Sequence, residues 1–440
     1  MLKQPIISYN CFNVQQYLSF SSKPDSLVEL VSTSEWSDEL EQELGQSHPS
    51  LDHETVIYVL KKLEKNPKKA YEFYNWVYGK NGFKHSIPVY SLVLRILSQK
   101  ESLEDFWTLI TKLSDAGHHI DKRTGWSIFA DFSKQKLSND AVKLNKMVEE
   151  SSVDTTVKSV VEVILGSDWN DQVKSKLSDL ELSLSDNSVL SILWELREYP
   201  SKALEFFRWV EEIQEYKHNA VTYNAIVWVF GFKLCIEEFW KLVKETKSAG
   251  YDIDMDTYAK ALKVFINKKK MKDTVELYEL MMDSPYKPPI EDCSYILGKI
   301  SLHGTTDLSL ADRVIKKFEE AGNTLSKSEY DMMHRSFSNL GKFDEANKIM
   351  ETMKIAGYAP DNVTFNQIVY GLCRAGKFEE ACNTLDVMET QGNVPDLKMR
   401  TTLIQGLSKT GEIDKALACL TKTQETYSDS VADLVKVLVN

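Results

Sequence analysis

The fold of this chain can be predicted from one stretch, Asn362 to Asp396, which reads NVTFNQIVYGLCRAGKFEEACNTLDVMETQGNVPD. Its first half places apolar residues on one face of an α-helix, at Phe365, Ile368, Val369 and Leu372. Gly376 ends that helix, and a second apolar face follows at Phe378, Ala381, Leu385 and Met388. Neither helix is long enough to be stable alone in water, so each needs a neighbour on its apolar face.

The neighbour is the next copy of the same unit. TTLIQGLSKTGEIDKALACL, at 401–420, repeats the pattern, and the turn glycines Gly341, Gly376 and Gly411 are spaced by 411 − 376 = 35 and 376 − 341 = 35. A fixed period of this size is the signature of stacked repeats in which each unit buries the face of the next. We therefore predict an all-α fold, an α-solenoid superhelix of stacked helix-turn-helix repeats.

Six tandem units account for the C-terminal half of the chain. We place them at 220–254, 255–289, 292–326, 327–361, 362–396 and 397–431, followed by a helical tail at 432–440. Residues 290–291 belong to no unit, and we call this two-residue interruption of the 35-residue step a slip. Lys269 stands where a turn glycine is expected.

A longer duplication covers the N-terminal half. NPKKAYEFYNWVYGKNGFKHS matches YPSKALEFFRWVEEIQEYKHN, and Trp76 and Trp209 are related by 209 − 76 = 133. A block from about residue 28 to 150 thus recurs at about 161 to 283, and we predict degenerate helical repeats over 25–219. The tryptophans of both copies, including Trp107 and Trp240, fall on apolar helix faces, which favours core packing over base stacking.

The composition excludes several classes of protein. No apolar run is long enough to span a bilayer, so no membrane partner is expected. The six cysteines form no CxxC and the eight histidines no HExxH, so we expect no metal and no cofactor. No glycine-rich phosphate loop, nucleophile elbow or paired-carboxylate motif is visible, so we expect neither an enzyme nor a small-molecule substrate.

Residues 1–24 differ from the rest of the chain. Asp25 is the first acidic residue, and the segment YLSFSS resembles the end of a mitochondrial transit peptide. Such peptides are usually rich in arginine, which this segment lacks, so a disordered tail is the alternative.

The repeated residues resemble a known family. The period of 35, with VTYN or VTFN at the start, GLCRAGKFEEA in the middle and MxxxGxxPD at the end, is similar to that of pentatricopeptide repeat proteins of the P type. The NPxKAxEFxxWV pattern looks like that of plant organellar members. The resemblance implies RNA binding, in which the fifth and last residues of a unit together select one base of a single strand.

Carried over unit by unit, the resemblance names candidate base-binding pairs. They are Asn224 with Asp254 and Asn366 with Asp396, which match a uracil-type pair, Ser91 with Asp121, which resembles a guanine-type pair, and the less typical Asp331 with Asp361. Three units depart from the pattern, with Ala259 and Pro289, Ile296 and Ser326, and Thr401 and Val431. The alternative is structural, because an aspartate before a helix is a good N-cap.

The charge balance limits the phosphate contacts. The net charge is −12, whereas phosphates are bound by Lys and Arg, although a local basic surface can outweigh the total. The run NKKKMKD offers Lys268, Lys269, Lys270 and Lys272 for phosphate, or else forms a solvated turn.

Two functions fit these observations. The first is an RNA-binding protein of the mitochondrial matrix, with a plastid less favoured, that binds mRNA or rRNA in processing, stability or translation. The second is an accessory component of the mitochondrial ribosome, a scaffold that touches rRNA and ribosomal proteins.

Overall fold

The computed structural model describes residues 23–48, 50–79, 83, 86–118, 120–150, 155–180, 184–212, 216–302, 308–390 and 392–426. Every regular element in these ranges is helical. The predicted transit peptide lies outside them, apart from its last two residues, and so does the predicted tail at 432–440. Within the same ranges no helix has the length and apolarity needed to cross a bilayer.

The chain divides into two compact units. Unit 1 comprises residues 1–268 and 280–288, and unit 2 comprises residues 269–279 and 289–440. Helix α17, Met271–Met282, contributes residues to both.

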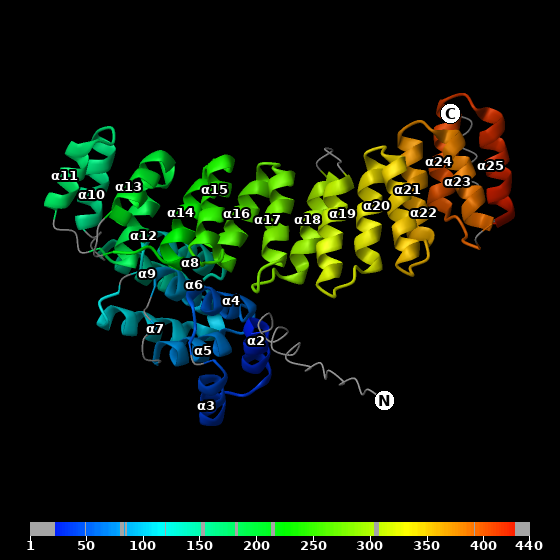
Figure 1. Cartoon of the computed structure of the whole chain (residues 1–440). Coiled ribbons are helices and arrows are strands. Elements are labelled where there is room, and N and C mark those ends of the chain that lie inside the picture. Colours follow the sequence, from blue (N-terminus) through cyan, green and yellow to red (C-terminus); the bar gives the residue numbers. More distant parts are fainter. Residues whose placement is uncertain are drawn as a thin grey trace, which may run out of the picture. The chain divides into compact units, whose positions relative to one another are not determined.

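Unit 2 is a stack of helix pairs (Figure 1). The first helices of its repeats pack on one another in sequence order, and each also packs on the second helix of its own pair. The pairs are α18 (Ile290–Leu302) with α19 (Leu308–Glu320), α20 (Lys327–Asn339) with α21 (Phe343–Ile355), α22 (Asn362–Arg374) with α23 (Phe378–Thr390), and α24 (Leu397–Lys409) with α25 (Ile413–Thr426). This arrangement confirms the predicted all-α solenoid.

Local chemistry sets the helix boundaries. Asp361 and Asp396 precede α22 and α24, and each carboxylate accepts backbone N–H bonds of the helix that follows. Gly376 adopts φ 74° in the turn between α22 and α23, a left-handed conformation that glycine adopts without a steric cost. Lys269 has φ 59° at the equivalent turn, so this lysine does adopt the conformation for which glycine is favoured.

The predicted slip at 290–291 is misplaced. Helix α18 begins at Ile290, directly after Pro289, and 290 − 255 = 35 keeps the phase of the preceding repeat. The extra two residues fall inside the repeat, because α20 begins 327 − 290 = 37 residues after α18 while α21 begins 343 − 308 = 35 residues after α19. The proline-rich segment stops one helix and starts the next without shifting the register.

Unit 1 contains the first copy of the duplicated block and most of the second. The helices of the first copy are α2 (Lys23–Thr33), α3 (Asp38–Ser47), α4 (His53–Lys62), α5 (Pro67–Gly79), α6 (Ile87–Leu97), α7 (Leu103–Asp115), α8 (Lys122–Lys134) and α9 (Ser138–Glu150). Those of the second copy are α10 (Thr155–Gly166), α11 (Asp171–Asp179), α12 (Asp186–Glu195), α13 (Pro200–Glu212), α14 (Ala220–Phe232), α15 (Ile236–Ser248), α16 (Met255–Asn267) and α17, which is shared with unit 2. The starts of α4 and α12 are separated by 186 − 53 = 133, as the duplication predicts.

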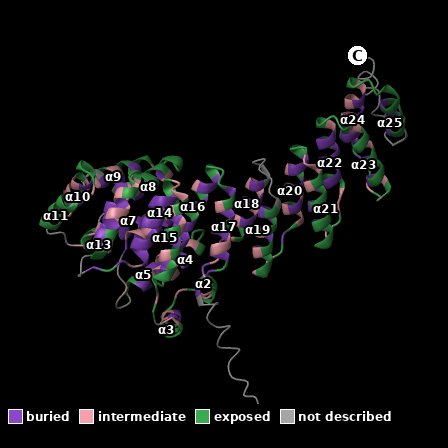
Figure 2. Ribbon diagram, turned by 45° about the horizontal axis from the view of Figure 1, so that its top comes forward, coloured by how far each residue is buried: buried purple, intermediate pink, exposed green. Residues whose placement is uncertain are grey.

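The two copies lie against each other. Helix α4 packs on α14 and α16, in addition to its own neighbours α5 and α6. Helix α14 is consequently buried along most of its length (Figure 2). Trp76 and Trp209 are buried as predicted, whereas Trp107 and Trp240 are half-buried.

Candidate nucleic-acid interface

Asn366 and Asp396 form a preorganised pair on the surface of unit 2. Asn366 lies on the second turn of α22, and its Nδ2 donates to Asp396 Oδ2 at 3.1 Å. Asp396 is the N-cap of α24, where its Oδ1 accepts from the backbone N–H of Met399 at 2.7 Å. One carboxylate therefore caps a helix with one oxygen and orients an amide with the other. The amide oxygen and the second amide N–H of Asn366 are then held in a fixed orientation at the surface.

The preceding pair, Asp331 and Asp361, is bridged by a cation. Lys327 Nζ lies 2.6 Å from Asp331 Oδ2 and 3.0 Å from Asp361 Oδ2. Thr364 Oγ1 donates to Asp331 Oδ1 at 2.9 Å, so both oxygens of this carboxylate have partners. The pair consequently presents a lysine and two bound carboxylates, with no free amide edge between them.

These contacts shift the pKa values in opposite directions. Burial alone would lower the pKa of Lys327, but its hydrogen bonds to Asp331 and Asp361 outweigh that effect and raise the pKa above its usual value. Burial would raise the pKa of Asp361, yet the bond from Lys327 brings the pKa below its usual range. Lys327 and Asp361 are therefore both charged near neutral pH.

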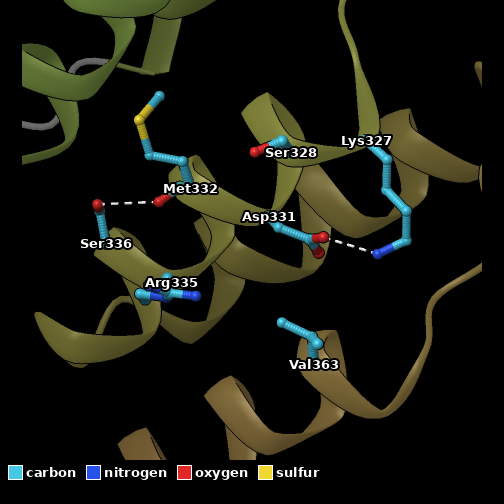
Figure 3. A pocket seen from close by; sticks show the side chains of 7 residues that line it. All are labelled: Lys327, Ser328, Asp331, Met332, Arg335, Ser336 and Val363. Atoms are coloured by element: carbon cyan, nitrogen blue, oxygen red, sulfur yellow. Dashed lines mark hydrogen bonds and ion pairs between the residues drawn. The ribbon is translucent and has the colours of Figure 1, made fainter.

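An open cavity of about 450 Å³ lies beside this pair, between the start of α20 and the start of α22. Figure 3 shows the Asp331 carboxylate turned toward Lys327, with Val363 of α22 facing α20. The cavity is lined by Lys327, Ser328, Asp331, Met332, Arg335, Ser336 and Val363. Val363 is 46% exposed, so the cavity combines an apolar wall with an exposed guanidinium, a mixture that suits the face of a base and its phosphate.

The same register in unit 1 has a different environment. Asn224 and Asp254 are each only 3% exposed. Asn224 Nδ2 donates to the carbonyls of Ala220 and Asp252, both at 3.0 Å, and its Oδ1 accepts from the N–H of Asp254 at 2.9 Å. Asp254 caps α16 through Thr257 N–H at 2.7 Å and faces His53 Nε2 at 3.4 Å. This pair is saturated by the protein itself.

Ser91 and Asp121 are also engaged internally. Ser91 is buried, and its Oγ lies 3.3 Å from Asp121 Oδ2 and 2.9 Å from Thr124 Oγ1. Asp121 is the N-cap of α8 and accepts from Thr124 N–H at 2.9 Å. The capping alternative is thus confirmed for Asp254, Asp361 and Asp396. Asp121 caps α8 in the same way. In the exposed pair of unit 2, capping and amide orientation coexist.

The observed start of α18 changes which residue is the fifth of its repeat. Counting from Ile290, the fifth residue is Ser294, and its hydroxyl hydrogen-bonds Glu329 at the start of α20. Ile296, which we counted as the fifth residue, is fully buried. Sequence reasoning missed Ser294 because the two-residue slip was placed before α18 instead of after it.

Two further surface groups were missed. Lys327 lies four residues before Asp331, a spacing that predicts an ion pair on a helix and could have identified it. Trp126 is the fifth residue of α8 and is 65% exposed, so it offers a stacking face without an edge that selects a base.

The lysine run follows α16, at the end opposite to Asp254. Lys268, Lys269, Lys270 and Lys272 are exposed around the turn between α16 and α17. Asp254 caps the opposite end of α16, about 20 Å away at 1.5 Å per residue. The phosphate role of these lysines stays a prediction.

The potential metal ligands of the described residues do not form a metal site. No group of three or more His, Cys, Asp or Glu side chains there could hold a metal ion. Burial raises the pKa of the Cys373 thiol to about 12 and that of Cys419 to about 11, which leaves both protonated.

The fold defines a class, the α-solenoid of stacked helix pairs. A model described as PPR repeat matches residues 330–358, 356–389 and 399–425. The chain belongs to the pentatricopeptide repeat family.

Three curated relatives come from Arabidopsis thaliana. A chloroplastic pentatricopeptide repeat-containing protein is 44% identical over 81% of this chain and 59% of its own length. The small ribosomal subunit protein mS81 is 30% identical over 78% of this chain and 54% of its own length. A mitochondrial pentatricopeptide repeat-containing protein is 29% identical over 79% and 53%. The chain thus spans little more than half the length of these relatives.

Two solved structures match at lower sequence identity. A crystal structure of the pentatricopeptide repeat protein PPR10 in complex with an 18-nt psaJ RNA element is 19% identical, with a TM-score of 0.37, over 94% of this chain and 59% of that one. Yeast Rmd9p in complex with a 16-nt target RNA is 13% identical, with a TM-score of 0.36, over 96% of this chain and 84% of that one.

Proposed function

We propose that this chain is an organellar RNA-binding repeat protein that holds a short single-stranded segment along the first helices of unit 2. The observation that carries the proposal is the surface pair Asn366 and Asp396, in which the carboxylate fixes the amide while also capping the next helix. A fixed amide presents one donor and one acceptor, which matches the Watson–Crick edge of an unstacked base. The resemblance assigns uracil to this pair.

The surroundings of the pair support binding without catalysis. Val363 and Arg335 provide an apolar wall and a cation beside the neighbouring repeat. Such a surface would hold RNA by stacking, edge recognition and phosphate contact. Its effect on the RNA would be to protect, expose or position the bound segment for other machinery.

The test is selection of RNA from a randomised pool by the full chain, followed by affinity measurements on the selected sequence. Asn366→Ala removes the base-edge hydrogen bonds, and we expect about 3- to 10-fold weaker binding and loss of one base preference. Asn383→Ala on α23 changes an exposed amide of the same repeat and serves as the control. Equal binding and unchanged selection by both variants would refute the role of Asn366.

A second candidate is an accessory component of the mitochondrial ribosome. It is favoured by the 30% identity to the small ribosomal subunit protein mS81. Sedimentation of a lysate on a sucrose gradient separates the two proposals. Co-migration with a ribosomal subunit, together with crosslinks to rRNA alone, would support this candidate over a free RNA-binding protein.

The organelle is part of the proposal. The mitochondrion is our prediction, and the relatives include one chloroplastic protein as well as mitochondrial ones. A fluorescent fusion of the full-length protein, imaged with mitochondrial and plastid markers, tests the assignment directly.

A further inference from the structure

The start of α4 contacts the start of α16 in unit 1. His53, the first residue of α4, lies 3.4 Å from Asp254, the N-cap of α16. The neighbouring Glu54 accepts from the backbone N–H of Asp252 at 3.3 Å. Asp252 is the residue whose carbonyl accepts from Asn224 Nδ2. Helix α4 is therefore bound to the loop that holds the candidate base-binding pair of this repeat.

A second anchor lies two residues further along, at Asp256. Asp256 on α16 is 5% exposed, and its Oδ1 lies 3.2 Å from Arg95 Nη2 of α6 and 3.9 Å from Lys61 Nζ of α4. Lys260, on the same helix as Asp256, binds the other carboxylate oxygen. One buried carboxylate thus joins both copies of the duplicated block with three cations, a geometry that compensates the burial of its charge.

Two further contacts hold the first copy, one to Tyr286 just beyond the second copy and one to α12 within it. Tyr286 OH lies 3.2 Å from Asp52 Oδ1 and 3.3 Å from Thr55 Oγ1 at the start of α4. The N–H of Ile87, at the start of α6, donates to Asn187 Oδ1 of α12 at 3.0 Å. The contact therefore extends over several helices, and it involves the helix starts at which unit 2 exposes Asn366 and Asp396.

We propose that the first copy of the duplicated block occupies the base-facing surface of the second, so that RNA is read only by the repeats of unit 2. The Asn224 and Asp254 pair then acts as the dock for α4 and selects no base, although its residue types match those of Asn366 and Asp396. With one base per repeat, the first helices α18, α20, α22 and α24 give a footprint of about four nucleotides. This inference rests on the proposed function for its RNA part and on intramolecular contacts for the rest.

The first experiment needs no RNA. Lys61 and Lys260 both contact Asp256, so a short amine-reactive crosslinker should join them in the full-length chain, 260 − 61 = 199 residues apart. A crosslink between Lys260 and the exposed Lys263 on the same helix shows that Lys260 is reactive. Detection of the second crosslink without the first would overturn the docking of the two copies.

The second experiment maps the RNA. The selected RNA, carrying 4-thiouridine, is irradiated with the full-length chain, and the crosslinked peptides are identified by mass spectrometry. We expect crosslinks on peptides from α18 to α24 and none on those containing Asn224 or Asp254. Crosslinks at Asn224 or Asp254 would overturn the inference. If no RNA is bound, the proposed function fails, and the lysine crosslink alone still decides whether the copies are docked.

Discussion

Asp396 and Asp254 each bind two partners, and the second partner determines the role of each carboxylate. Asp396 and Asp254 each cap a helix with Oδ1, at 2.7 Å from the accepted N–H. The Oδ2 of Asp396 orients the Asn366 amide at the surface, whereas the Oδ2 of Asp254 faces His53 in the interior. The capping role follows from local sequence, but the role of the second oxygen depends on what packs against it.

The two roles of Asp396 can be separated by Asp396→Asn. An asparagine still caps α24 through its amide oxygen, so we expect less than about 1 kcal/mol change in the free energy of unfolding. The new amide group faces the Asn366 amide, which must turn to present its oxygen, so donor and acceptor exchange places at the surface. RNA selection should then yield a different base at this position. Asp396→Ala, which loses the cap, should cost about 1 kcal/mol, and unchanged selection by Asp396→Asn would contradict the pairing.

The helix pairs are held close by glycines on the first helix. A Cβ added at Gly371 on α22 would lie 2.5 Å from the backbone carbonyl oxygen of Ser338 on α20. At Gly406 on α24 it would lie 2.1 Å from the ring of Phe378. Since 406 − 371 = 35, the glycine that opens the repeated GL motif is kept for packing between neighbouring helices, while Gly376 serves the turn.

Gly371→Ala should therefore destabilise the protein. The backbone of Ser338 cannot move without shifting α20, so we expect a loss of about 1–3 kcal/mol despite the better helix propensity of alanine. Gly45→Ala in α3 is the matched control, because no atom lies within 4 Å of the added Cβ, and it should be neutral or stabilising. Chemical denaturation measures both. Equal stability changes in the two variants would show that α20 and α22 do not approach so closely.

At the scale of the whole molecule, the contact between the two copies contains a titratable group. Glu54 is 5% exposed, and burial raises its pKa to about 7, with Asp52 adding to the shift and His53 opposing it. Because the folded pKa lies above the ordinary value of 4.5, the stabilising contribution is fully present below about pH 4.5 and is lost as the pH rises through about 7. Raising the pH from about 4.5 to above about 7 should therefore weaken the contact between α4 and the start of α16.

The expected pH dependence can be measured by thermal unfolding at about pH 6 and about pH 8.5. The full cost of ionising Glu54 is of order 3 kcal/mol, and about 1 kcal/mol of it falls between these two pH values, so the wild-type melting temperature should be lower at the higher pH. Glu54→Gln is neutral at both values and should flatten this difference, while the exposed Glu43→Gln should leave it in place. A wild-type profile that matches that of Glu54→Gln would exclude Glu54 as the titrating group.

The helix pairs, their 35-residue step and the 133-residue duplication could be predicted from the sequence. The reason is that caps, turn residues and apolar faces act within a few residues of each other. The sequence also placed Asn and Asp at matching positions of several repeats. The difference between Asn366 and Asn224 depends on the tertiary structure. Asn366 lies at the surface, whereas Asn224 is buried and makes its hydrogen bonds within the protein. Burial of these side chains depends on helices some 200 residues away in the chain, such as α4 on α16, and no local pattern encodes which face a distant segment will cover.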